Sequence, residues 1–263
     1  MLMNTNNVGI FSTQKAKCIN SKNFKIIKPK NVRMLRRILF MALIFHFTLA
    51  FGQNEINQVD GNGERHGVWR KYYNNDRIRY SGKFEHGKEV GVFKFYSASN
   101  SENPIIIKKY DPDSQFAEVS FYKPNGVLES EGKMKGKNRE GKWLFYHENG
   151  KSIMSEENYA NGKLEGPYTT YYPTGEPTEI TSYKNGLLDG NYKKYSIKGF
   201  LYQDFNYSKG KLNGMAIYYS RMTGDLIKKG PFKDDQRVGT WENYVDGELV
   251  STEQPAIKPD RDK

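Results

Sequence analysis

The chain has 263 residues, of which 14% are aromatic and 27% charged, and it carries a formal net charge of +11. This charge is uneven, because residues 1–52 hold nine Lys or Arg and no acidic residue, which leaves 32 basic against 30 acidic residues in 53–263. Binding to a nucleic-acid backbone needs a basic stripe, so the near-neutral remainder excludes nucleic acid as the expected partner. With 19 tyrosines and modest aliphatic content, the chain predicts a sheet covered by amphipathic rings.

The first 52 residues have the composition of targeting sequence. Residues 1–33 are basic and rich in Asn and Lys, and Met34 can itself be a start, so we interpret them as an over-extended gene start; an organellar targeting extension is the alternative. Residues 34–52 combine a basic start, an apolar run of 13 residues and small residues before Gln53, which is typical of a secretory signal peptide. The run is shorter than the ~20 residues of a spanning helix. We therefore expect export to the periplasm, the cell surface or the medium, with a retained membrane anchor as the alternative.

Cysteine chemistry plays no part in this prediction. The single cysteine, Cys18, lies upstream of the expected cleavage site. The exported chain would then hold no disulfide, no thiolate metal site and no cysteine nucleophile.

Residues 67–250 repeat one unit with a period of 24 to 26 residues. Each copy opens on an anchor glycine, replaced once by alanine. A tyrosine follows each anchor by five residues, and a large apolar residue precedes each later anchor by seven. Two independent registers that agree indicate a repeat array. The anchors are Gly67, Gly91, Ala117, Gly141, Gly166, Gly190, Gly214 and Gly239, and the residues at minus seven are Phe84, Tyr110, Met134, Tyr159, Tyr183, Tyr207 and Phe232.

Each unit contains two apolar stretches separated by turn signals. Pairs such as Asn149-Gly150 and Asn161-Gly162 favour type I′ hairpin turns, in which both central residues have positive φ. The pattern predicts an all-β fold, an elongated single-layer antiparallel sheet of about eight consecutive β-hairpin repeats. Residues 53–66 form a polar lead-in to this array, and residues 251–263, with two prolines and mixed charges, form a flexible tail.

The tyrosines at plus five are predicted to form a structural ladder that stacks from copy to copy. They are three positions away from the aromatic residues at plus two, which is an odd number. In a regular strand the two sets face opposite sides, unless a bulge beside the anchor glycine brings them together. The ladder comprises Tyr72, Tyr96, Tyr122, Tyr146, Tyr171, Tyr195, Tyr219 and Tyr244.

The unit resembles a known repeat. Gly-x-Trp-x-x-Tyr-Tyr, then Asn-Gly, then Tyr-x-Asn-Gly-Lys-x-x-Gly is similar to the bacterial variant of the MORN repeat, found in YwqK-family antitoxins. The closest copies run from Gly141 to Gly166 and from Gly166 to Gly190, within a resemblance that covers about residues 64–250. It implies a row of hairpins that acts as a non-enzymatic scaffold for protein or membrane contacts. The Tyr-x-Gly opening of the original MORN pattern is only partly matched, so phospholipid binding is not carried over.

No catalytic constellation is evident. The histidines of the exported chain, His66, His86 and His147, lie in three different units without metal-ligand spacing, and we interpret His66 and His86 as polar turn residues. We therefore expect no enzyme activity, no metal, no cofactor and no small-molecule substrate. The chemically distinctive surface is the set of rings left uncovered on a one-layer sheet. The candidate partner-binding residues are Tyr73, Phe95, Phe121, Phe145, Tyr172 and Tyr218.

The sequence predicts an exported, non-enzymatic repeat scaffold that binds a protein or envelope partner of unknown identity through its aromatic sheet face. One alternative is an antitoxin that neutralises a toxin by direct contact. Another is binding of cell-wall or other carbohydrate by stacked aromatic rings.

Overall fold

The computed structural model describes residues 55–111 and 113–255, and these residues form strands and turns without a helix. The predicted signal peptide and basic extension lie outside the described residues, as does most of the tail. No described segment is a helix of the length and hydropathy needed to span a membrane. The strands are β1(Gln58–Val59), β2(Arg65–Tyr72), β3(Ile78–Glu85), β4(Lys88–Phe95), β5(Ile106–Tyr110), β6(Ala117–Tyr122), β7(Leu128–Lys135), β8(Asn138–Tyr146), β9(Ile153–Ala160), β10(Lys163–Leu164), β11(Gly166–Tyr171), β12(Pro177–Lys184), β13(Leu187–Leu188), β14(Gly190–Tyr195), β15(Leu201–Ser208), β16(Lys211–Leu212), β17(Gly214–Tyr219), β18(Leu226–Lys233), β19(Gln236–Arg237), β20(Trp241–Val245) and β21(Glu248–Glu253).

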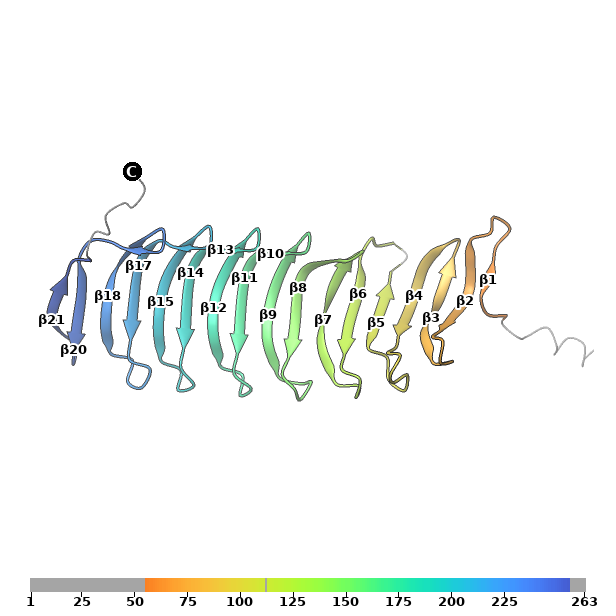
Figure 1. Ribbon diagram of the computed structural model, residues 1–263, viewed down its shortest axis with the longest axis horizontal. Helices are drawn as coiled ribbons and strands as arrows, with labels where there is room; N and C mark the ends of the chain where they lie inside the picture. Colours follow the sequence, from red (N-terminus) through yellow and green to blue (C-terminus); the bar gives the residue numbers. More distant parts are fainter. Residues whose placement is uncertain (1–54, 112, 256–263) are drawn as a thin grey trace, which may run out of the picture. The chain divides into compact units, whose positions relative to one another are not determined.

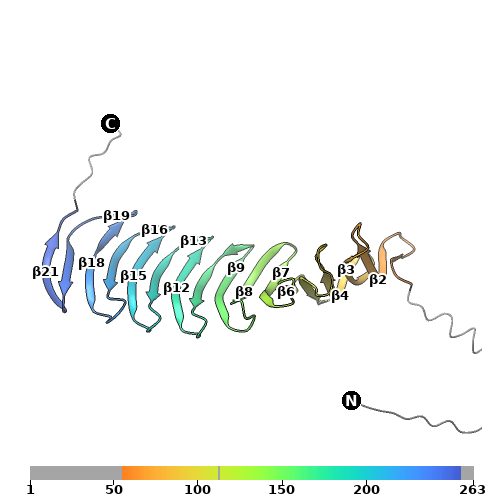
Figure 2. The ribbon, with the colours of Figure 1, turned by 60° about the horizontal axis from the view of Figure 1, so that its bottom comes forward.

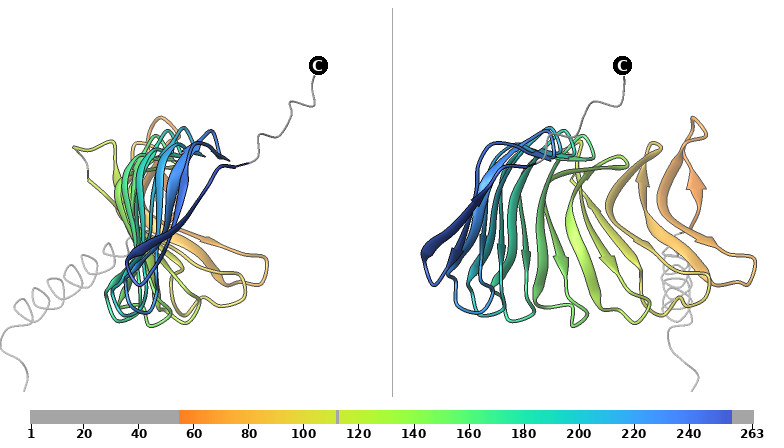
Figure 3. Two further views of the ribbon diagram at one scale, coloured as in Figure 1. Left: turned by 90° about the vertical axis from the view of Figure 1, so that its left-hand side faces the viewer. Right: turned by 60° about the vertical axis from the view of Figure 1, so that its left-hand side comes forward.

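The strands make one open antiparallel sheet in hairpin order, which confirms the predicted fold (Figure 1). Each unit contributes one long hairpin: β2–β3, β4–β5, β6–β7, β8–β9, β11–β12, β14–β15, β17–β18 and β20–β21. The strands are bowed (Figure 2), and the described hairpins lie one behind another in a single layer when viewed along the row (Figure 3). Each unit therefore packs mainly against its two neighbours.

The two ends of each hairpin use different turns. At the end that leads to the next unit, both central residues of most turns have positive φ, as at Asn161 (51°) and Gly162 (78°), which is the predicted type I′ pattern; in the β7–β8 turn only Gly136 does (61°). At the other end of most long hairpins only one residue does, as at Gly126 (83°), whose backbone nitrogen donates to the Lys123 carbonyl oxygen at 2.8 Å. This is a three-residue loop with a left-handed last residue rather than a type I′ turn. The prediction of type I′ geometry was therefore wrong for these turns, Asn149-Gly150 included, but it is confirmed for Asp246-Gly247 between β20 and β21, where φ is 51° and 81°.

A β-bulge recurs opposite the plus-five tyrosine of the hairpins. The sequence had suggested a bulge beside the anchor glycine. In β2–β3, Lys71 pairs with Tyr80 but Tyr72 pairs with Ile78, so the extra residue lies on the return strand. The outgoing strand keeps its regular pleat, and plus-two and plus-five side chains face opposite sides. The same shift is present in every long hairpin except β4–β5.

The side that carries plus two, plus four and minus seven is the buried one, and we call it the ring face. Several of its rings pack edge-on within and between hairpins: Phe84 lies 5.8 Å from Trp69 and 5.1 Å from Phe93, centroid to centroid. Further along, Phe205 lies 4.9 Å from Tyr218. Such pairs contribute about 0.5–1.5 kcal/mol each beyond simple burial. The rings therefore form a ladder along the sheet, as expected of a repeat array.

This ladder does not consist of the tyrosines that were predicted to form it. Among the ring pairs within the described residues, none includes a plus-five tyrosine. These tyrosines lie on the opposite face, where Tyr146 donates a hydrogen bond to Glu131 and Tyr244 to Glu242. The prediction was wrong because the side chains on the ring face with the minus-seven residues are those two residues after the anchor, not those five residues after it.

Glycines that are not anchors leave room for the largest rings to lie against the sheet. A Cβ at Gly132 would come within 2.5 Å of the Trp143 ring, and one at Gly82 within 2.4 Å of Phe93. Both glycines stand nine residues before an anchor, and neither has positive φ, so their reason is space rather than backbone conformation. In the seventh unit the sizes are reversed, with Phe205 at minus nine and Ala216 at plus two in one buried cluster. Ring and gap are thus matched in size across neighbouring strands.

Candidate functional site

All three tryptophans of the chain stand at plus two, and each is covered by an arginine four residues earlier. The guanidinium carbon of Arg139 lies 4.7 Å from the Trp143 ring centroid, and that of Arg237 lies 3.9 Å from Trp241. Arg65 lies over Trp69 at 5.1 Å. Cation–π contacts of this kind stabilise by about 0.5–1 kcal/mol when exposed and more when desolvated. The ring face is therefore aromatic and cationic together, although the repeat region is close to neutral.

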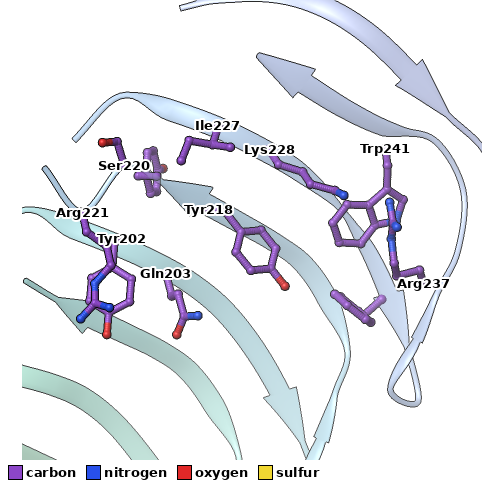
Figure 4. A pocket seen from close by; sticks show the side chains of 11 residues that line it. Tyr202, Gln203, Tyr218, Ser220, Arg221, Ile227, Lys228, Arg237 and Trp241 are labelled. Atoms are coloured by element: carbon purple, nitrogen blue, oxygen red, sulfur yellow. The ribbon is translucent and has the colours of Figure 1, made fainter. Parts of the chain in front are cut away.

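The ring face is hollowed at its C-terminal end, where Tyr202, Tyr218 and Trp241 line a groove of about 700 Å³ (Figure 4). We call it the aromatic groove. It spans β15, β17, β18 and β20, so no single unit forms it. The remaining lining residues are Gln203, Tyr219, Ser220, Arg221, Ile227, Lys228, Phe232 and Arg237.

The groove gathers three cations around its rings. Arg221 lies 4.4 Å from the Tyr202 ring centroid, and Lys228 lies 5.3 Å from that of Trp241. Glu253 on β21 binds both Lys228, at 3.1 Å, and Arg237, and these hydrogen bonds lower the pKa of Glu253. One carboxylate therefore holds two of the cations in place, while Arg221 belongs to the exposed rim.

Two buried donors in the groove have no hydrogen-bond partner among the described residues, Arg237 Nε and Trp241 Nε1. The corresponding nitrogen of Trp143 donates to the Lys133 carbonyl oxygen at 2.9 Å. An unpaired buried donor costs about 1–3 kcal/mol. A ligand with oxygen acceptors would remove part of this cost, which favours carboxylate-bearing ligands over purely apolar ones.

The three phenylalanines chosen as partner-binding residues lie on the ring face but are half-buried. Phe121 and Phe145 pack against the cluster around Trp143, and Phe95 lies 6.3 Å from Phe93, centroid to centroid. Their change to serine would be a poor test of partner binding, because these rings are also part of the packing.

Tyr73 and Tyr172 have a structural contact at the loop edge. Tyr73 Oη donates to the Tyr96 carbonyl oxygen at 2.8 Å, and Tyr172 Oη to the Tyr195 carbonyl oxygen at 3.1 Å, one unit further on in each case. His147 Nε2 makes the same contact to Tyr171 at 3.1 Å. Of the six candidates, Tyr218 lines the aromatic groove. Four other lining residues were not predicted, although the sequence contains the Arg-x-x-x-Trp spacing: Arg221, Lys228, Arg237 and Trp241.

Several tyrosines are expected to ionise late. Burial, reinforced by Glu131, raises the pKa of Tyr146 to about 12, and burial followed by the charge of Glu157 raises the pKa of Tyr168 to about 12. The folded chain keeps these protons while the unfolded chain releases them near the ordinary pKa of about 10. Stability should therefore fall as pH rises from about 10 to about 12, together with a cooperative rise in phenolate absorbance. Ionisation near pH 10 of all tyrosines while the sheet stays folded would contradict this.

The fold defines a hairpin-repeat protein with an aromatic groove, and comparison with known families is more specific. The family model described as MORN repeat variant matches residues 139–161 and 164–185. These are the two adjacent units in which the sequence most closely resembled that repeat. Repeats of this family are generally non-catalytic scaffolds that bind proteins or membranes. A search of curated proteins finds no match.

Proposed function

We propose that this chain is an exported, non-enzymatic repeat scaffold that binds an extended, acidic segment of a partner protein in the aromatic groove. The observation that carries the proposal is the groove itself, in which three cations surround tyrosine and tryptophan rings. Export rests on the composition of residues 34–52. An antitoxin role is the competing proposal, and it requires the uncut chain in the cytosol.

The chemistry of the groove selects its partner. Tyrosine, tryptophan and arginine are the residue types that contribute most to protein interfaces, because they bury large areas at low cost in side-chain freedom. Clustered cations attract carboxylates and disfavour basic partners. A volume of about 700 Å³ suits a few side chains rather than a whole domain. A peptide that combines Asp or Glu with an apolar or aromatic residue would meet both parts of the groove.

The test is selection of a displayed library of random peptides against the full chain, followed by affinity measurement. We expect enrichment of acidic peptides with aromatic residues. The double variant Arg221→Glu/Lys228→Glu should weaken their binding at least about tenfold, because two attractive contacts become repulsive. Lys135→Glu/Lys137→Glu, on the exposed β7–β8 turn, is the matched control, since it changes net charge equally.

Equal losses in the two double variants would contradict the groove as the binding site. Selective binding of a polysaccharide would favour the carbohydrate alternative. Recovery of the chain from the cytosol with residues 34–52 intact would contradict export and favour the antitoxin.

A further inference from the structure

The fold brings together three potential metal ligands that lie far apart in the sequence. Asp60 lies in the loop before β2, His66 on β2, and His86 in the β3–β4 turn. Each offers one ligand atom, and these atoms all lie within 4.8 Å of one another. His86 Nδ1 lies 2.7 Å from an Asp60 carboxylate oxygen, and the two imidazole centroids are 5.1 Å apart. From the sequence both histidines were predicted to be polar turn residues in separate units.

One of these nitrogens lacks the contact that its burial requires. His66 Nδ1 is buried and has no hydrogen-bond partner among the described residues. Buried polar atoms without a partner are rare in folded proteins, and each one calls for an explanation such as a bound ion. A metal ion is one such partner, because it accepts the lone pair of a neutral imidazole nitrogen.

Later units show what normally occupies these positions. Glu140, one residue before its anchor, accepts a hydrogen bond at 2.9 Å from the backbone nitrogen of Asn161 in the following turn. Glu165 and Asp189 accept the same bond from Asn185 and Lys209, at 2.6 and 3.0 Å. In these three units the contact ties the second turn to the first strand of the same hairpin. In the first unit His66 replaces the carboxylate, and His86 replaces the turn residue.

We propose that Asp60, His66 and His86 bind a divalent transition-metal ion of the Zn²⁺ class, which fastens the lead-in loop and the second turn to the first hairpin. Two imidazoles and a carboxylate are a ligand set that Zn²⁺ accepts, and a water molecule would complete a tetrahedron. A site with two imidazole ligands binds Mg²⁺ and Ca²⁺ weakly, because these ions prefer oxygen ligands.

The geometry requires only side-chain adjustment. Bonds of about 2 Å in a tetrahedral zinc site place ligand atoms about 3.3 Å apart. His86 can move closer, because its side chain is 69% exposed, while the Asp60 side chain is 12% exposed and fixed. Asp60 is held by hydrogen bonds from the backbone nitrogens of Asn62 and Glu64 at 2.9 and 3.0 Å. Asp60 and His66 thus both belong to backbone that is held by hydrogen bonds, Asp60 in its loop and His66 in β2.

The location gives the ion a structural role. The first unit of an array has a neighbour on one side only, so its outer edge gains least from stacking. Here that edge is closed by β1, which pairs with β2 through two residues. A metal ion that joins the β1–β2 loop to the β3–β4 turn would stabilise the end of the array against fraying.

The experiment is a titration of the full chain, purified without a polyhistidine tag, with ZnCl₂ alone. We expect one Zn²⁺ bound to this site, no displacement by excess Mg²⁺, and slower amide hydrogen exchange in β1 and the β3–β4 turn. His86→Asn should weaken zinc binding at least about tenfold. It should keep the turn, because Asn161 occupies the equivalent place with φ of 51° against 46° for His86. His147→Asn is the matched control and should bind zinc unchanged.

A second variant separates a metal site from a purely structural contact. His66→Glu/His86→Asn recreates the carboxylate contact of Glu140 and Asn161, so it should lose zinc binding but keep slow exchange without the metal. Zinc affinity that is undetectable in the parent chain, or equal in the parent and His86→Asn chains, would overturn the proposal. So would exchange rates in β1 that do not respond to zinc.

Discussion

Replacing Gly132 with alanine is expected to destabilise the array by about 1–3 kcal/mol. This is the opposite of the usual effect, because alanine normally stabilises a strand interior relative to glycine. The added Cβ would lie 2.5 Å from the Trp143 ring, closer than non-bonded carbon atoms approach. Trp143 is 0% exposed and cannot move aside without displacing its neighbours. The measurement is the midpoint of urea unfolding, with hydrogen exchange to locate the loss in the third and fourth units.

Gly61→Ala is the control for this prediction. Gly61 has ordinary negative φ, and nothing lies within 4 Å of the Cβ it would gain, so a change within about 0.5 kcal/mol is expected. The double variant Gly132→Ala/Trp143→Ala adds a second check. If the clash is the cause, the alanine at 132 should cost much less once the indole is absent. An equal cost in both backgrounds would mean that the contact with Trp143 is not responsible.

Replacing Trp143 with alanine should cost about 3–5 kcal/mol, the range for a large buried aromatic residue. The indole contacts Phe121 and Phe145, lies under Arg139, and donates its Nε1 hydrogen bond at 2.9 Å to the Lys133 carbonyl oxygen. Because neighbouring units depend on one another, the loss should spread to both flanking hairpins. Calorimetric or chemical unfolding, combined with residue-level hydrogen exchange, would measure both effects.

Trp69→Ala provides the matched comparison at the end of the array. Trp69 has the same plus-two position and an arginine above it, but it is only half-buried and belongs to the first unit. Its replacement should cost clearly less than that of Trp143 and should leave the later hairpins protected. Similar losses for the two tryptophans would indicate that the array unfolds as one unit irrespective of position.

Much of the fold could be predicted from the sequence, because the signals that specify hairpins are local. Turn residues such as Asn161-Gly162 set the ends of strands, and the recurring anchor glycines set the period. The error over the ladder came from treating the most regular residue as the most buried one. The tyrosine at plus five recurs in every unit, yet it lies on the face opposite Trp143 and Phe145.

The candidate sites were less predictable, since their residues come from different strands. Arg221 and Trp241 line one groove from separate units, and nothing in their spacing identifies the hollow between them. His66 and His86 stand 20 residues apart, which fits no local metal motif. Aligning the units would have shown the signal, because these histidines occupy positions that other units fill with a carboxylate and a turn residue.

The all-β class, the period and the order of the hairpins follow from the sequence alone, because strand and turn preferences act over a few residues. Which face is buried, where the ring ladder runs, and the approach of Asp60 to two histidines became evident in the folded chain. These features depend on the register between neighbouring strands, and a bulge of one residue on a return strand changes which side chains meet. Packing between units therefore places the aromatic groove, and the fold of the lead-in loop onto the first hairpin places the histidine cluster.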